Sequence, residues 1–189
     1  MKSLLAVSSG IDRINEIIGR AVAWLILASV LVSAINAIVR KVLSDSSNKW
    51  LEMQWYLFGA AFLLAAAYTL KQNEHVRIDV LYARHSRRVQ HWIDLFGHLV
   101  FLMPFVTLMI WYLTPWAIRS FVSGEMSNNS GGLILWPAKM LLLGGFVLLW
   151  LQGLSEIIKK IAVMAGHITD PHEGAAPHGT PLAVTETQE

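Results

Sequence analysis

Residues 50–91 read WLEMQWYLFGAAFLLAAAYTLKQNEHVRIDVLYARHSRRVQH, an apolar run followed directly by a run rich in charges and histidines. The apolar run, Trp50–Leu70, contains one charged residue, Glu52. Its length matches the roughly 20 residues that a helix needs to cross about 30 Å of hydrocarbon. Because backbone amides in lipid must be satisfied within their own segment, this run predicts a membrane-spanning helix. The polar run Lys71–His91 then connects it to the next apolar segment.

Three further apolar runs of similar length lie at residues 21–39, 92–112 and 133–157. The composition agrees with this pattern, since 54% of the 189 residues are hydrophobic and only 15% are charged. We therefore predict an all-α integral membrane protein with four transmembrane helices in a single domain, residues 1–165. The remainder, 166–189, is rich in acids and prolines after Gly166 and has no Lys or Arg, so it is predicted to be a disordered tail.

The residues before the first span also follow a helical pattern. Apolar side chains recur at spacings of three and four, at Leu4, Val7, Ile11, Ile14 and Ile18. Polar side chains occupy the opposite face, at Ser8, Asp12, Arg13, Asn15 and Glu16. The pattern predicts an amphipathic helix lying in the membrane interface. A disordered N-terminal segment is the alternative.

The distribution of Lys and Arg near the span ends predicts the orientation. Ten lie on the side shared by both termini and the 71–91 connection, and five lie on the other side, at Arg40, Lys41, Lys49, Arg119 and Lys139. Both termini are therefore predicted to be cytoplasmic. The connection would contain a short amphipathic segment whose apolar residues, Ile78, Leu81 and Tyr82, face the membrane. Because the basic residues cluster at span ends, contact with lipid phosphates is expected and nucleic-acid binding is not.

Ionisable residues inside the predicted spans are few. Glu52 and Lys139 lie near the predicted outer interface, and Asp94 and His98 are four residues apart, so they can pair on one helix face. No carboxylate lies at a predicted bilayer centre, where a cation-coupled or multidrug-type carrier needs one. The chain has no cysteine and lacks motifs such as G-x-S-x-G and H-E-x-x-H. We expect neither an enzyme nor a bound cofactor.

Seven histidines keep one alternative open, a haem-binding four-helix anchor subunit of a redox complex. Bis-histidine ligation needs two imidazoles facing each other at one depth inside the bundle. Only His98 lies clearly within a predicted span, and His91 lies near the edge of the same one. In the polar connection, His75, Asp79 and His91 lack the close spacing of helical metal-ligand sets. A metal site there is therefore not expected.

The second predicted span carries a row of small residues. Ala61 and Ala65 are spaced as small-xxx-small, a pattern that lets another helix approach closely. The approaching helix could belong to a partner protein or to one of the other three spans. Together with the missing central charge, this row favours a membrane protein that works through a partner.

Two segments of the chain resemble a known family. They are WLEMQWYLFGAAFLLAAAYTLKQNEHVRIDVLY and EMSNNSGGLILWPAKMLLLGGFVLLWLQGLSEIIKKI, with the run around His75, Arg77 and Asp79 as the most recognisable feature. In these segments the chain resembles the small membrane subunit, of DctQ type, of tripartite ATP-independent periplasmic (TRAP) transporters. The resemblance covers about residues 13–161.

The resemblance implies a function in the bacterial inner membrane. In this family a periplasmic binding protein delivers an organic anion to a large membrane subunit, which carries the substrate and sodium sites, and the small subunit braces it. Residues expected to serve structure or assembly are Trp50, Glu52, Ala61, Ala65, His75, Arg77, Asp79, Asp94, His98, Glu125 and Lys139. The segment GGLILWPAK hints at the branch that imports 2-oxo acids and other small carboxylates. Substrate choice belongs to the other two proteins.

Overall fold

The computed structural model describes residues 1–43, 47–72 and 85–169 of the chain, and these residues are mostly helical. The helices are α1 (Lys2–Leu43), α2 (Asn48–Gln72), α4 (Arg87–Phe96), η1 (Gly97–Leu102), α5 (Met103–Ser123) and α6 (Trp136–Met164). Four helical stretches, the third formed by α4, η1 and α5 together, are long and apolar enough to cross a membrane. The predicted all-α membrane fold is therefore confirmed. The amphipathic segment predicted around Ile78 and most of the predicted tail lie outside the described residues.

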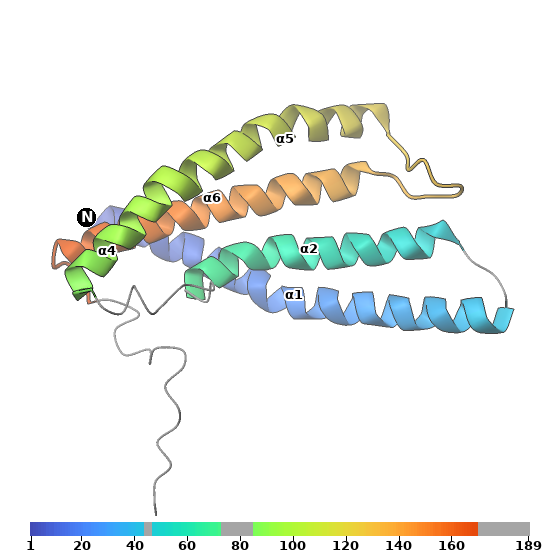
Figure 1. Cartoon of the computed structure of the whole chain (residues 1–189), viewed down its shortest axis with the longest axis horizontal. Helices are drawn as coiled ribbons and strands as arrows, with labels where there is room; N and C mark the ends of the chain where they lie inside the picture. Colours follow the sequence, from blue (N-terminus) through green and yellow to red (C-terminus); the bar gives the residue numbers. More distant parts are fainter. Residues whose placement is uncertain (44–46, 73–84, 170–189) are drawn as a thin grey trace, which may run out of the picture.

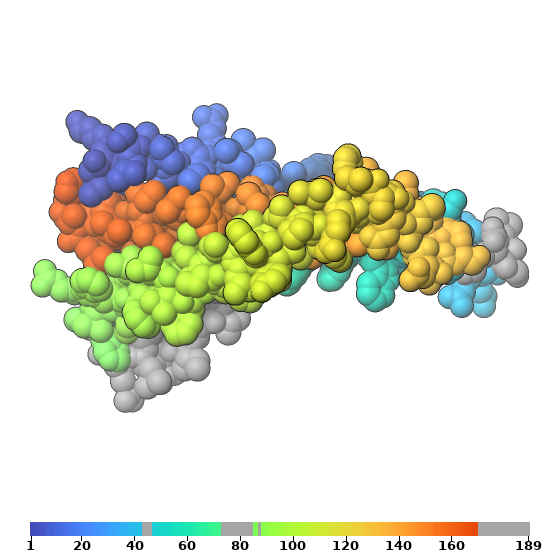
Figure 2. Space-filling view, turned by 90° about the horizontal axis from the view of Figure 1, so that it is seen from above, coloured from blue at the N-terminus to red at the C-terminus, as the bar shows by residue number. Residues whose placement is uncertain are grey.

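The helices form an open row in the order α5, α6, α2, α1 (Figure 1). α6 is central, because it contacts α1, α2 and α5, while α1 packs mainly on α2. The helices run side by side, and the N-terminus lies at one end of their long axis (Figure 1). At this end of the helices, α6 lies between the first part of α1 and α4 (Figure 2). The C-terminal end of α6 lies at this same end (Figure 1).

α1 is a single helix of 42 residues. At 1.5 Å per residue it is about 63 Å long, roughly twice the thickness of the hydrocarbon core. The sequence divides this region into an interfacial helix and a span meeting near Arg20, whereas the structure continues one helix through both. Gly19 lies where α1 meets α2, since a Cβ there would be only 2.4 Å from Cγ of Tyr68. The glycine thus permits the close crossing.

The third span changes its winding within the helix. Over Gly97–Leu102 it forms a π-helix, in which the backbone N–H of Met103 donates to the carbonyl of His98, five residues earlier. Pro104 follows directly and has no N–H that could donate to the preceding turn. A local change in helix winding is common next to a proline inside a helix. Gly97, a weak helix former, begins the altered segment.

The described residues bury little apolar surface. The buried apolar side chains are mostly small and include Ala60, Ala61, Ala67, Ala117 and Ala162. Large side chains such as Trp55 and Trp111 are each 78% exposed. In lipid this exposure carries no hydrophobic penalty, and helix contact instead depends on close packing of small residues. Gly145 of α6 provides one such contact, because a Cβ there would lie 2.9 Å from Cβ of Leu63 on α2.

Candidate functional site

The loop between α5 and α6 is fastened to α2 by one carboxylate. Glu52 accepts hydrogen bonds from the hydroxyl of Ser127, from Nδ2 of Asn129 at 2.8 Å and from the backbone N–H of Leu133 at 2.5 Å. We call these four residues the Glu52 cluster. Three donors around one carboxylate fix the position of the loop relative to α2, because hydrogen bonds to an ionised group are directional and stronger than neutral ones.

Two neighbouring turns of α2 extend this attachment. Nδ2 of Asn48 donates to the carbonyl of Ser130, and the hydroxyl of Tyr56 donates to the carbonyl of Ile134, each at 3.0 Å. With Glu52 these residues are spaced four apart and so share one helix face. Gly132 is needed here, because a Cβ would lie 2.5 Å from that of Ser127. The start of α2 thus acts as a platform for the loop.

An ion pair joins the same loop to α6. Lys139 pairs with Glu125, and its ammonium lies 4.3 Å from the centre of the Trp116 ring on α5. The hydrogen bond from Lys139 holds the pKa of the Glu125 carboxyl below its ordinary value of 4.5, so this carboxyl is ionised at neutral pH. Lys139 therefore joins α5, α6 and their connecting loop, and its positive charge is balanced inside the chain.

The other end of the helices, where the N-terminus lies, contains a more buried set of polar side chains. On α1 these are Ser8, Asp12 and Asn15, and on α6 they are Gln152, Ser155, Glu156 and Lys159. We call these seven residues the α1–α6 polar cluster. Ser8, Asn15, Gln152 and Ser155 are each at most 2% exposed.

Gln152 lies at the centre of the α1–α6 polar cluster. Its Oε1 accepts from Nδ2 of Asn15 at 2.7 Å, and its Nε2 donates to Asp12 at 2.9 Å and to Glu156 at 2.8 Å. Lys159 pairs with both carboxylates, at 3.0 and 2.5 Å. One cation between two acids leaves a single negative charge, which the amide and hydroxyl donors share. The cluster therefore fixes the register of α1 against α6.

The structure places the polar face of the amphipathic helix at residues 1–20 against another helix. Its polar face packs on α6, and its apolar residues Leu4, Val7 and Ile14 are 50–55% exposed. In a soluble protein the burial would be reversed. Next to lipid, the arrangement hides the polar groups from hydrocarbon and leaves the apolar groups outside.

Asp94 and His98 do not form the side-chain pair that their spacing allows. The carboxylate of Asp94 instead pairs with Lys160 of α6 at 2.9 Å. Nδ1 of His98 donates to the backbone carbonyl of Asp94 at 2.6 Å. The ion pair ties α4 to α6, so it extends the set of interhelical polar contacts at this end of the row.

The other predicted assembly residues occupy varied positions. Ala61 is 3% exposed and serves contacts within the chain, Ala65 is partly buried and Trp50 is 42% exposed. His75, Arg77 and Asp79 lie outside the described residues. Among the described residues, no three His, Asp or Glu side chains are grouped as a metal ion would require.

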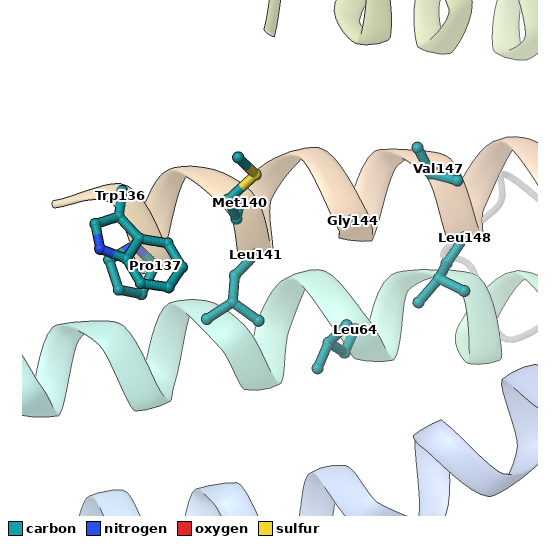
Figure 3. Close-up of a pocket in the computed structure, with 8 residues that line it drawn as sticks. All are labelled: Leu64, Trp136, Pro137, Met140, Leu141, Gly144, Val147 and Leu148. Carbon is teal, nitrogen blue, oxygen red and sulfur yellow. The ribbon is translucent and has the colours of Figure 1, made fainter. Parts of the chain in front are cut away.

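A shallow groove of about 510 Å³ runs between α2 and α6 (Figure 3). Its lining is apolar and comes from Leu64 of α2 and otherwise from α6, with Trp136, Met140, Gly144 and Leu148 among the α6 residues. Such a surface offers no group for acid–base or metal chemistry. It suits a lipid chain or another apolar helix.

The arrangement is that of a four-span helical protein fastened at both ends by polar contacts. A family model for the DctQ component of tripartite ATP-independent periplasmic transporters matches residues 29–163. The chain belongs to this family. A search of curated proteins and a search of solved structures returned no match.

Membership of the DctQ family makes the chain a transporter component, not an enzyme, and the haem-subunit alternative gains no support from it. It also implies, in general terms, association with a large membrane subunit and a periplasmic binding protein. The matched range includes the Glu52 cluster and Gln152 but begins after Asn15.

Proposed function

We propose that this DctQ-type chain braces the large membrane subunit of a TRAP transporter during import of an organic anion. A periplasmic binding protein would deliver the anion, and a sodium gradient would drive its entry. A small carboxylate such as a 2-oxo acid is the substrate class that the GGLILWPAK segment favours. In this proposal the small subunit contributes a rigid surface in the bilayer and no substrate site.

The open row of helices is the observation that carries the proposal. In a closed four-helix bundle the two outer helices of the row, α1 and α5, would also pack on each other. Here α2 and α6 are flanked on their edges only, and the groove between them remains open. Large apolar side chains of α2 are exposed, such as Trp55 at 78% and Phe62 at 70%, which suits lateral contact with the helices of a larger membrane protein.

The placement of charge supports a bracing role. The carboxylates of the described spans lie away from the middle of their helices, and each contacts other residues of the chain; they are Asp12, Glu16, Glu52, Asp94 and Glu156. Proton- and ion-coupled carriers place such groups near the midplane, beside substrate. The polar groups of this chain are used to hold its own helices in position.

The proposed location is the bacterial inner membrane with both termini in the cytoplasm. The described helices place the N-terminus and the end of α6 at one end of the row (Figure 1), in keeping with an even number of crossings. The excess of Lys and Arg at that end then favours the cytoplasmic side.

Co-purification tests the proposed assembly. When the chain is co-expressed with the large membrane subunit of its transporter, affinity purification of either one should recover both in a fixed ratio that survives gel filtration. A four-span protein of similar size from another family serves as the control for non-specific association in detergent. Recovery of the large subunit at the level of this control would refute the proposal.

A further inference from the structure

A polar groove lies between α1 and α2, at the end of these helices that is opposite the N-terminus (Figure 1). It has a volume of about 490 Å³. Its lining residues are Ser33, Asn36, Ala37, Arg40 and Lys41 of α1 and Gln54 of α2. The α1 residues recur at helical spacing, so they follow one face of the helix over about 12 Å.

The charge of this α1–α2 groove differs from that of two other polar cavities among the described residues. In those cavities a carboxylate accompanies the cations, with Glu125 beside Lys139 in one and Asp12 and Glu16 beside Lys71 and Lys159 in another. Among the described residues, those that line the α1–α2 groove include two cations and no carboxylate. Its remaining polar groups are two amides and a hydroxyl, which are neutral hydrogen-bond donors.

The position of the groove indicates where its ligand comes from. Arg40 and Lys41 lie in the last turn of α1, at the end of an apolar span. Long cationic side chains at such a position reach to the level of the lipid headgroups. Further into the span the same helix face continues with Ile26 and Val30, which are 49% and 58% exposed. Polarity therefore falls along the groove from cations, through amides, to hydrocarbon.

We propose that the α1–α2 groove binds the headgroup of an anionic phospholipid. The phosphodiester would lie against Arg40 and Lys41, and the amides of Asn36 and Gln54 would donate to the ester carbonyls. The acyl chains would then follow Ile26 and Val30. This order of cation, neutral donor and apolar surface corresponds to the order of groups along a phospholipid.

Lipid titration tests this site on the intact chain. Purified protein in detergent is titrated with dioctanoyl phosphatidylglycerol or, for comparison, zwitterionic dioctanoyl phosphatidylcholine, and bound lipid is counted by native mass spectrometry. The test variant is Arg40→Gln/Lys41→Gln. The matched control, Lys49→Gln/Arg119→Gln, removes two exposed cations from the same end of the row but from outside the groove.

The two variants should differ clearly. Each cation near a lipid phosphate contributes a factor of about 5, so the dissociation constant for phosphatidylglycerol should rise about 25-fold in the test variant. It should rise less than about threefold in the control, in which only the long-range field changes. Equal effects in the two variants, or equal binding of both lipids by the wild type, would overturn the proposal. Displacement of phosphatidylglycerol by millimolar inorganic phosphate would also overturn it, because the site would then accept soluble anions.

Discussion

Two adjacent glycines on α6 allow a test of how α2 and α6 pack. Gly145 faces α2, where an added Cβ would lie 2.9 Å from Cβ of Leu63 and 3.2 Å from its carbonyl oxygen. At Gly144 an added Cβ would meet no other atom within 4 Å. Gly145→Ala and Gly144→Ala are therefore the same chemical change, one residue apart, in two different environments.

The expected magnitudes follow from these distances. Replacing glycine by alanine inside a helix favours the helix by about 1 kcal/mol at either position. At Gly145 the methyl group must also displace the backbone of α2, and such overpacking costs about 1–3 kcal/mol. The helix term is common to both variants, so Gly145→Ala should be less stable than Gly144→Ala by about 1–3 kcal/mol.

Unfolding of the purified subunit in mixed micelles, followed by far-UV circular dichroism as the fraction of denaturing detergent rises, measures this difference. Gly144→Ala should unfold at or above the wild-type midpoint and Gly145→Ala below that of Gly144→Ala. Equal midpoints for the two alanine variants would show that α2 and α6 are not in this contact, and the order of helices in the row would have to be revised.

Three further predictions concern other parts of the chain. Gln152→Leu removes three buried hydrogen bonds and, at about 0.6 kcal/mol for each in a membrane, should lower the free energy of unfolding by about 2 kcal/mol. Adding Asn15→Leu should recover part of this loss, because no unpaired amide then remains. A further loss in the double variant would contradict this reasoning. Because the folded pKa of Glu125 is lowered from 4.5, its pair with Lys139 stabilises the fold above that pH and is lost as the pH falls through the lowered value. The melting temperature of the wild type should accordingly fall more steeply in this acid range than that of Glu125→Gln, and parallel curves would contradict the pairing. A single cysteine at the exposed position Ser130 should be labelled by an impermeant thiol reagent in intact cells, whereas one at the exposed position Ser86 should be labelled only after lysis. The reverse pattern would invert the proposed orientation.

The sequence predicts the four spans because hydrocarbon thickness fixes their length. It does not predict which face of α1 is buried. At residues 1–20 the periodicity correctly indicates an amphipathic helix, but it cannot show that Ser8 and Asn15 meet Gln152 and Ser155 more than 130 residues away. A signal was nevertheless present, because Gln152, Ser155 and Lys159 also recur at helical spacing inside or beside a predicted span.

The site residues divide in a similar way. Glu52 and Lys139 could be selected as rare charges in apolar runs, but the donors to Glu52 come from a loop about 80 residues away. The spacing of Asp94 and His98 suggests a local pair, and Lys160 takes the place of the histidine because α6 packs beside α4. The small residue Ala61 serves contact within the chain, which spacing alone could not distinguish from contact with a partner.

Uptake by proteoliposomes tests most directly the claim that this chain braces a transporter and does not transport by itself. Vesicles containing the purified chain alone should accumulate no labelled organic anion under an inward sodium gradient, with or without the periplasmic binding protein. Vesicles that also contain the large membrane subunit should accumulate the anion once the binding protein is added, and omission of this chain should abolish that uptake. Uptake by the chain alone, or undiminished uptake by the large subunit without it, would contradict the account.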